Sequence, residues 1–116
     1  MPAPSLHPRL RVLRGKEIAL GPGKAELLEA ISRTGKLGRA AEDLGMSYMR
    51  AWNLIRLMNR GFREPLVELA RGGRAHGGAA LTETGAAVLS LYRRMEKASL
   101  RASGPAWRRL RVLLRP

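Results

Sequence analysis

The sequence contains no cysteine and only two histidines, His7 and His76, among its 116 residues. Without cysteine, disulfide scaffolds, thiolate zinc sites and cysteine nucleophiles are excluded, and two distant histidines do not make up a histidine metal site. Asp43 is the one aspartate. The sequence therefore lacks a catalytic constellation, and it predicts a protein that is not an enzyme and binds no metal or other cofactor.

Aromatic residues and long apolar runs are also scarce. Only 4% of the residues are aromatic, so aliphatic side chains have to form the core, as they do in small helical domains. No apolar run approaches the roughly 18 to 20 residues that cross a bilayer, and Met1–Leu10 contains early prolines where a secretory signal would have an apolar stretch. We therefore expect a cytoplasmic, single-domain protein without a membrane partner.

Acidic residues number nine, against 22 lysines and arginines, which gives a net charge of +13. The excess predicts a polyanionic partner. It grows along the chain, because six basic residues and no acidic one follow from Lys97 onward. Arginine outnumbers lysine 18 to 4, which suits phosphate recognition by the planar guanidinium but is explained equally well by an arginine-rich genome.

Apolar periodicity predicts the elements of the first half of the chain. Residues 9–20 alternate basic and apolar around Gly15, which favours a short hairpin. Helical spacing then predicts three helices, over residues 25–34, 37–44 and 48–60. Ser47 is a suitable N-cap for the third helix, and Gly45 supplies the left-handed residue that ends the second.

The second half of the chain predicts a strand pair and a fourth helix. Residues 65–70 and 79–81 have the character of strands, and the loop between them holds four glycines and two arginines. A helix capped by Thr82 is expected to run to about Ala102, where Gly104 and Pro105 would end it. These elements divide the chain into an N-terminal arm (1–8), a domain (9–102) and a basic C-terminal tail (103–116).

One pentapeptide, Arg-Leu-Arg-Val-Leu, occurs twice, at residues 9–13 and 109–113. Coincidence is the favoured interpretation in a chain this rich in leucine and arginine. A paired role in one sheet or one interface is the alternative.

The second and third helices have the spacing of a helix-turn-helix. Ala41 is small enough for two helices to cross closely, and Gly45 allows the tight turn between them. The apolar stripe of the third helix is Ala51, Leu54, Ile55 and Met58, so its opposite face is polar and basic. With the glycine-rich hairpin, this predicts a mainly α fold with a small β wing, a winged helix-turn-helix. An ordinary helical hairpin with solvated charges is the alternative.

The candidate DNA-binding residues lie in three places: on the third helix, at the start of the second helix and in the wing. They are Ser47, Tyr48, Met49, Arg50, Trp52, Asn53, Arg56, Arg60, Lys36, Arg39, Arg71 and Arg74. Arginine bonds bidentately to guanine and asparagine to adenine in the major groove, and the wing is expected on the backbone or in a minor groove. For Trp52, packing against the domain is an equal alternative, and Lys97–Arg115 either contacts flanking DNA or forms a disordered tail.

Three stretches also resemble a known family. Leu37–Ile55, with Met46-Ser-Tyr and Ala51-Trp-Asn inside it, Glu64–Glu68 and Leu81–Gly85 are similar to the N-terminal DNA-binding domain of ModE-type, molybdate-responsive regulators, which is a LysR-like winged helix. The resemblance covers about Arg9 to Glu96. Members of that family carry further domains that bind molybdate or tungstate, whereas this chain ends at Pro116. The resemblance thus implies a stand-alone DNA-binding unit, whose signal comes from a separate effector-binding protein if it has one.

These observations favour a sequence-specific regulator that binds double-stranded DNA as a homodimer. A protein that coats DNA or RNA through charge alone, without sequence preference, is the alternative. The fourth helix has more apolar residues than a small winged core is expected to cover, unless they only cap the core of the monomer. The candidate dimer interface consists of Val88, Leu89, Leu91, Tyr92, Met95 and Leu100.

Overall fold

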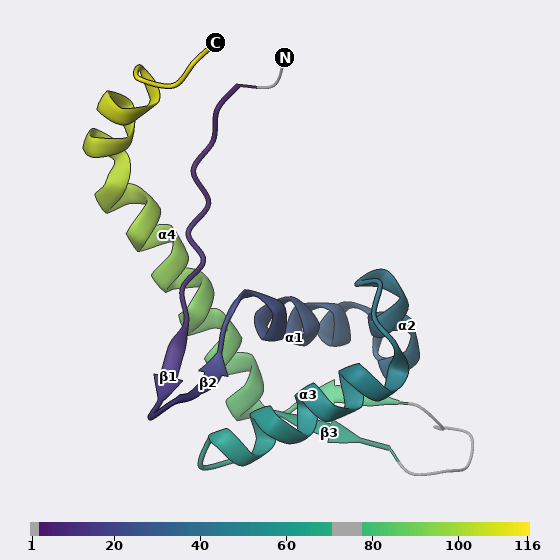
Figure 1. Cartoon of the computed structure of the whole chain (residues 1–116). Helices are drawn as coiled ribbons and strands as arrows, with labels where there is room; N and C mark the ends of the chain where they lie inside the picture. The colour runs from purple at the N-terminus through teal and green to yellow at the C-terminus, as the bar shows by residue number, and fades with distance from the viewer. Residues whose placement is uncertain (1–2, 71–77) are drawn as a thin grey trace.

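The computed structural model describes residues 3–70 and 78–116. The elements in chain order are β1 (Val12–Arg14), β2 (Glu17–Leu20), α1 (Pro22–Thr34), α2 (Leu37–Asp43), α3 (Tyr48–Gly61), β3 (Val67–Leu69), β4 (Ala79–Leu81) and α4 (Glu83–Arg111). Figure 1 shows α1, α2 and α3 as a helical body with the β3–β4 hairpin beside α3, while α4 extends well beyond it. The predicted winged helix-turn-helix, mainly α with a small β wing, is confirmed.

Both strand pairs are two-stranded and antiparallel. In the first, Leu13 pairs with Ile18 and Arg14 with Glu17, and Gly15 in the turn has a φ of 63°, a value that glycine adopts without steric cost. In the second, Val67 pairs with Leu81 and Leu69 with Ala79. The predicted N-terminal hairpin and wing strands are therefore both present.

The core lies where α1, α2 and α3 meet and is almost entirely aliphatic. Leu27, Leu28 and Ile31 of α1 are buried there. Ala41 is buried within α2, and Gly45 in the turn between α2 and α3 has a φ of 67°. The small side chain and the left-handed glycine are the two features that the helix-turn-helix spacing requires, and both are used as predicted.

Two predicted helix ends differ from the structure. The first helix begins at Pro22 rather than near Ala25, because proline fits the first turn, where its missing N–H has no partner to lose. The fourth helix does not end near Ala102 as predicted but runs through Gly104 and Pro105 to Arg111. An interior proline removes one hydrogen bond and bends a helix, and the surrounding turns continue on both sides of it here. Of the two alternatives for Lys97–Arg115, the disordered tail is therefore wrong as far as Arg111.

The repeated pentapeptide adopts two conformations. At residues 9–13 it leads into β1, whereas at residues 109–113 it forms the last turn of α4 and the chain after it. The two copies do not share a sheet. The alternative of one shared sheet is therefore wrong.

Candidate nucleic-acid interface

The N-terminus of α3 is capped as the sequence predicts. The Ser47 hydroxyl accepts a hydrogen bond from the backbone N–H of Arg50 at 3.1 Å. Ser47, Tyr48, Met49 and Arg50 are all exposed at this end of the helix. The polar and basic side chains of Ser47, Tyr48 and Arg50 therefore lie at the positive end of the α3 dipole, an arrangement that favours phosphate.

Helix α3 separates an apolar face from a polar one. Ala51, Ile55 and Met58 are buried in the core, while residues at spacings of three and four form the exposed face. That face comprises Met49, Asn53, Arg56, Leu57 and Arg60. Two shallow grooves follow it, and both are lined by Asn53 and Leu57. The predicted face is therefore exposed as one continuous strip.

Leu57 lies in this strip although it is absent from the residues predicted from the sequence. Its side chain is 43% exposed, and that of Met49 is 62% exposed. Leu57 follows Asn53 by four residues and is followed by Arg60 after three, so the helical spacing itself is the signal that identifies it. An exposed apolar residue among basic ones is suited to a thymine methyl group.

Trp52 both packs and contacts a candidate DNA-binding residue. Its indole is partly buried against the core, and the guanidinium of Arg56 lies 5.2 Å from the centre of its ring. That distance corresponds to a cation–π contact, which restricts the guanidinium to the ring face. Trp52 thus packs against the domain and supports Arg56, while its contact with DNA stays a prediction.

The start of α2 is joined to the wing. Lys36 forms a bridge with Gly78, and the N–H of Ala79 donates to the carbonyl of Gly35 at 3.0 Å. Lys36 and Arg39 are both exposed beside this junction. They therefore remain available to a phosphate backbone.

Arg33 is engaged within the protein, since its guanidinium bonds Asp43 at 3.1 Å. Arg71 and Arg74, which are predicted to contact DNA from the wing, lie outside the described residues.

The predicted dimer surface on α4 requires a correction at Tyr92. Its side chain is 1% exposed, and its hydroxyl donates to the carbonyl of Leu10 at 2.7 Å. Burial raises the pKa of the phenol, and Glu96 adds to this rise. Tyr92 is thus part of the monomer and has no surface to offer a partner. Val88 and Leu89 are partly buried against the same core.

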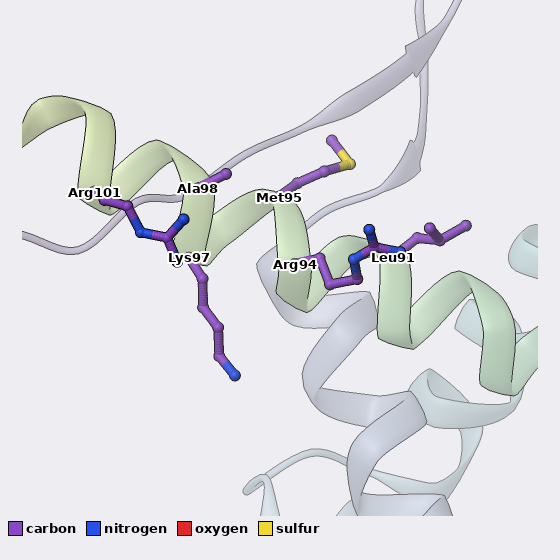
Figure 2. Close-up of a pocket in the computed structure, with 6 residues that line it drawn as sticks. All are labelled: Leu91, Arg94, Met95, Lys97, Ala98 and Arg101. Carbon is purple, nitrogen blue, oxygen red and sulfur yellow. The ribbon is translucent and has the colours of Figure 1, made fainter.

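Leu91 and Met95 remain exposed, at 52% and 45%. Together with Ala98 they line a groove of about 580 Å³ along α4, whose other residues are Arg94, Lys97 and Arg101. Figure 2 shows the side chains of Leu91 and Met95 extending to the same side of the helix, with Lys97 pointing away from them. These two residues are therefore the accessible apolar part of the surface.

Leu100 is exposed but does not extend this surface. It follows Leu91 by nine residues, which is about two and a half helical turns, and so lies on the opposite side of α4. The six predicted residues therefore do not form one face. Ala98 and Ala102, seven residues after Leu91 and Met95, continue the apolar stripe in their place.

The far end of α4 is basic and exposed. Lys97, Arg101, Arg108, Arg109 and Arg111 all have exposed side chains there. In Figure 1 this end of the helix lies far from α3 and β3 and close to the N-terminal segment. These charges therefore sit apart from the polar face of α3.

Neither a membrane span nor a metal cluster is found in residues 3–70 and 78–116. None of the helices described there is long and apolar enough to span a membrane. Within the same residues, no group of three metal-ligating side chains lies together.

The fold and the exposed face of α3 define a winged helix-turn-helix domain. The chain belongs to the bacterial regulatory helix-turn-helix proteins of the LysR family, whose family model matches residues 23–86. That match covers more than half of the chain, and it begins in α1 and ends in α4.

The curated relatives are named as molybdenum proteins or as ModE transcriptional regulators. The chain is 41% identical to the molybdenum-pterin-binding protein MopA of Rhodobacter capsulatus over 73% of its length. It is 44% identical to the molybdenum transport protein ModE of Azotobacter vinelandii over 67% of its length. It is also 41% identical to the DNA-binding transcriptional dual regulator ModE of Escherichia coli over 61% of its length. The resemblance seen in the sequence is confirmed.

The matches cover only part of each relative. They span 32% of MopA, 29% of the Azotobacter protein and 27% of the Escherichia coli regulator. Among solved structures, a complex described as CbnR_DBD–DNA has a TM-score of 0.60 at 22% identity, covering 76% of this chain and 95% of that one. A structure of CbnR, a LysR family transcriptional regulator, has a TM-score of 0.55 at 21% identity, covering 72% of this chain and 27% of that one. These structural matches support the same fold.

Proposed function

We propose that this chain is a sequence-specific regulator of transcription that binds double-stranded DNA, with α3 in the major groove. The observation that carries the proposal is the exposed strip on α3, which is polar and basic opposite a fully buried apolar face. A helix held in this way by its inner face leaves its outer face free to enter a groove. The net charge of +13 supplies the attraction to a polyanion.

Residues in the middle of α3 recognise the bases. Asn53 is suited to adenine and Arg56 to guanine, because each side chain forms two parallel hydrogen bonds with its base. The indole of Trp52 beneath the Arg56 guanidinium limits its orientations. Arg50 and Arg60 lie toward the two ends of the strip, and Met49 and Leu57 offer apolar contacts to thymine methyl groups.

Backbone contacts surround that region. Ser47 and Tyr48 at the N-terminus of α3, and Lys36 and Arg39 at the start of α2, are exposed where a phosphate backbone passes a helix-turn-helix. Arg71 and Arg74 of the wing complete the set on the backbone or in the minor groove. Such contacts increase affinity for every sequence alike.

The active form proposed is a homodimer that pairs through Leu91, Met95 and Ala98 of α4. A domain of this size reads few base pairs alone, and two-fold pairing on half-sites about 34 Å apart increases the length of sequence read. The exposed apolar side chains of Leu91, Met95 and Ala98 in the groove on α4 support this pairing. The DNA-binding activity is assigned to residues 9–102. The protein would act in the cytoplasm, where the chromosome lies, and a separate protein would supply any effector signal.

Selection from a random pool of duplexes tests the proposal. A sequence-specific regulator enriches one motif, with mismatches that cost about 1–3 kcal/mol each. The alternative, an architectural protein that binds DNA or RNA through charge, shows a steep salt dependence and no enriched motif. Failure to enrich a motif would contradict the proposed function.

A further inference from the structure

Strand β3 has one edge that β4 does not cover. The carbonyl of Leu66 accepts from the N–H of Thr82, and the N–H of Ala70 donates to the carbonyl of Gly78, both at 2.9 Å. Because backbone groups alternate in direction along an antiparallel strand, the N–H and carbonyl of Val67 face away from β4. Val67 is only 2% exposed, so these two groups need a protein partner.

Asn59 of α3 supplies that partner. Its Oδ1 accepts hydrogen bonds from the N–H of Leu66 at 2.8 Å and from the N–H of Val67 at 3.2 Å. Its Nδ2 donates to the carbonyl of Val67 at 3.1 Å. The side-chain amide therefore pairs with Val67 as a neighbouring strand would, and it joins α3 to the β3–β4 hairpin.

The start of α4 holds the same segment from another side. The hydroxyl of Thr82 donates to the carbonyl of Pro65 at 2.6 Å and accepts from the N–H of Gly85 at 2.9 Å. A Cβ atom on Gly85 would collide with the carbonyl of Leu66. The segment is thus fixed between α3 and α4, with Asn59 as its side-chain hydrogen-bond link to α3.

We propose that Asn59 is a positioning residue that holds the β3–β4 hairpin at a fixed angle to α3, so that both contact one DNA duplex together. The inference rests on the proposed function. Asn59 lies three residues after Arg56 and one before Arg60, so the turn of helix that presents these arginines also carries the link. Fixing two contacting elements before binding removes the cost of ordering them on DNA.

The test uses Asn59→Asp in the full chain. Aspartate retains the acceptor for Leu66 and Val67 but loses the donor, and it places a negative oxygen against the Val67 carbonyl. Asn59→Ala removes both groups without that repulsion, and it serves where the aspartate variant does not fold. Met58→Ala is the matched control, because it lowers stability by removing a buried side chain at the adjacent position, and Met58 takes no part in the three hydrogen bonds between Asn59 and the β3 segment.

Affinity for the duplex that the wild-type chain selects is measured at several salt concentrations and at a temperature where circular dichroism shows every variant folded. We expect both Asn59 variants to lose affinity about tenfold. We also expect a weaker salt dependence: the magnitude of the slope of log K against log salt should decrease by about one for each phosphate that the hairpin no longer reaches. The base preference at positions read by α3 is retained, and Met58→Ala keeps the wild-type slope.

The two possible failures are distinct. Asn59 variants that match Met58→Ala in affinity and salt slope would overturn the role of Asn59 alone. A wild-type chain that selects no duplex would instead contradict the proposed function.

Discussion

The hydroxyl of Tyr92 donates a hydrogen bond to the backbone carbonyl of Leu10, 82 residues earlier in the chain, at 2.7 Å. This bond attaches the segment before β1 to α4. Near it, the guanidinium of Arg93 bonds Glu29 of α1 at 2.6 Å and Glu96 of α4 at 2.8 Å. One turn of α4 is thus fixed to the N-terminal segment and to α1, while Leu91 and Met95 in the same part of the helix stay exposed.

Tyr92→Phe is expected to lower the free energy of unfolding by about 1 kcal/mol, because the Leu10 carbonyl loses its donor while the ring remains in place. For a domain of this size the melting temperature should fall by about 4–8 °C. Tyr48→Phe is the matched control, since its side chain is exposed and makes no such bond in the described residues. Equal melting temperatures for Tyr92→Phe and wild type would contradict this role.

Stability should also decrease at high pH through Tyr92. Burial raises the pKa of this phenol above its ordinary value, which is about 10. The folded state therefore retains the proton longer than the unfolded state, so the stabilisation is complete below a pH of about 10 and is lost as the pH rises through the folded-state pKa. Urea titrations of wild type and Tyr92→Phe should converge over this range, and parallel pH profiles would argue against it.

Substitutions on α3 should separate base recognition from backbone binding. Asn53→Ala and Arg56→Ala each remove a bidentate side chain, so the preference for the selected base should weaken by about 1–3 kcal/mol. Arg39→Ala, at the start of α2, should weaken binding to all duplexes alike and reduce the salt slope by about one. Competition titrations with matched and single-mismatch duplexes measure both quantities. An Arg56→Ala variant with unchanged base preference would remove Arg56 from the readout.

The dimer proposal predicts an effect that depends on the face of α4. Leu91→Glu and Met95→Glu place a carboxylate in the proposed contact and should yield monomers in sedimentation at micromolar concentration. Leu100→Glu provides the control, because this residue is exposed on the opposite side of the same helix and should leave the dimer intact. A wild-type chain that is monomeric at every concentration, with and without DNA, would exclude the dimer.

Molybdate and tungstate are expected not to change the DNA affinity of this 116-residue chain. The cation-lined groove at Arg94, Lys97 and Arg101 is open to solvent on α4, where water competes for an oxyanion. Titration of molybdate into a DNA-binding assay measures this directly. Tight, saturable binding of molybdate would show that the expectation is wrong.

The helix-turn-helix was predictable because its signals are local. The spacing of Ala51, Ile55 and Met58 defines the buried face of α3, and Gly45 and Ser47 determine where the flanking turn ends. These features depend on residues within a few positions of one another. The exposed face of α3 followed from them by geometry alone.

The parts that were missed depend on distant contacts. Leu10 approaches Tyr92 only after the chain has folded, so an apolar stripe on α4 could not reveal which of its members were buried. Asn59 bonds backbone groups seven and eight residues later, a role that has no sequence signature. The repeated pentapeptide also depends on its surroundings, since identical residues lead into strand β1 at one site and end helix α4 at the other.

The most direct test of the central claim is a map of backbone chemical shift changes when the selected duplex is added to the labelled protein. We expect the largest changes on α3, from Ser47 to Arg60, and at Lys36 and Arg39 beside it. The far end of α4, from Lys97 to Arg111, should change little. Changes confined to that basic end, with α3 unaffected, would contradict the assignment of α3 as the recognition helix.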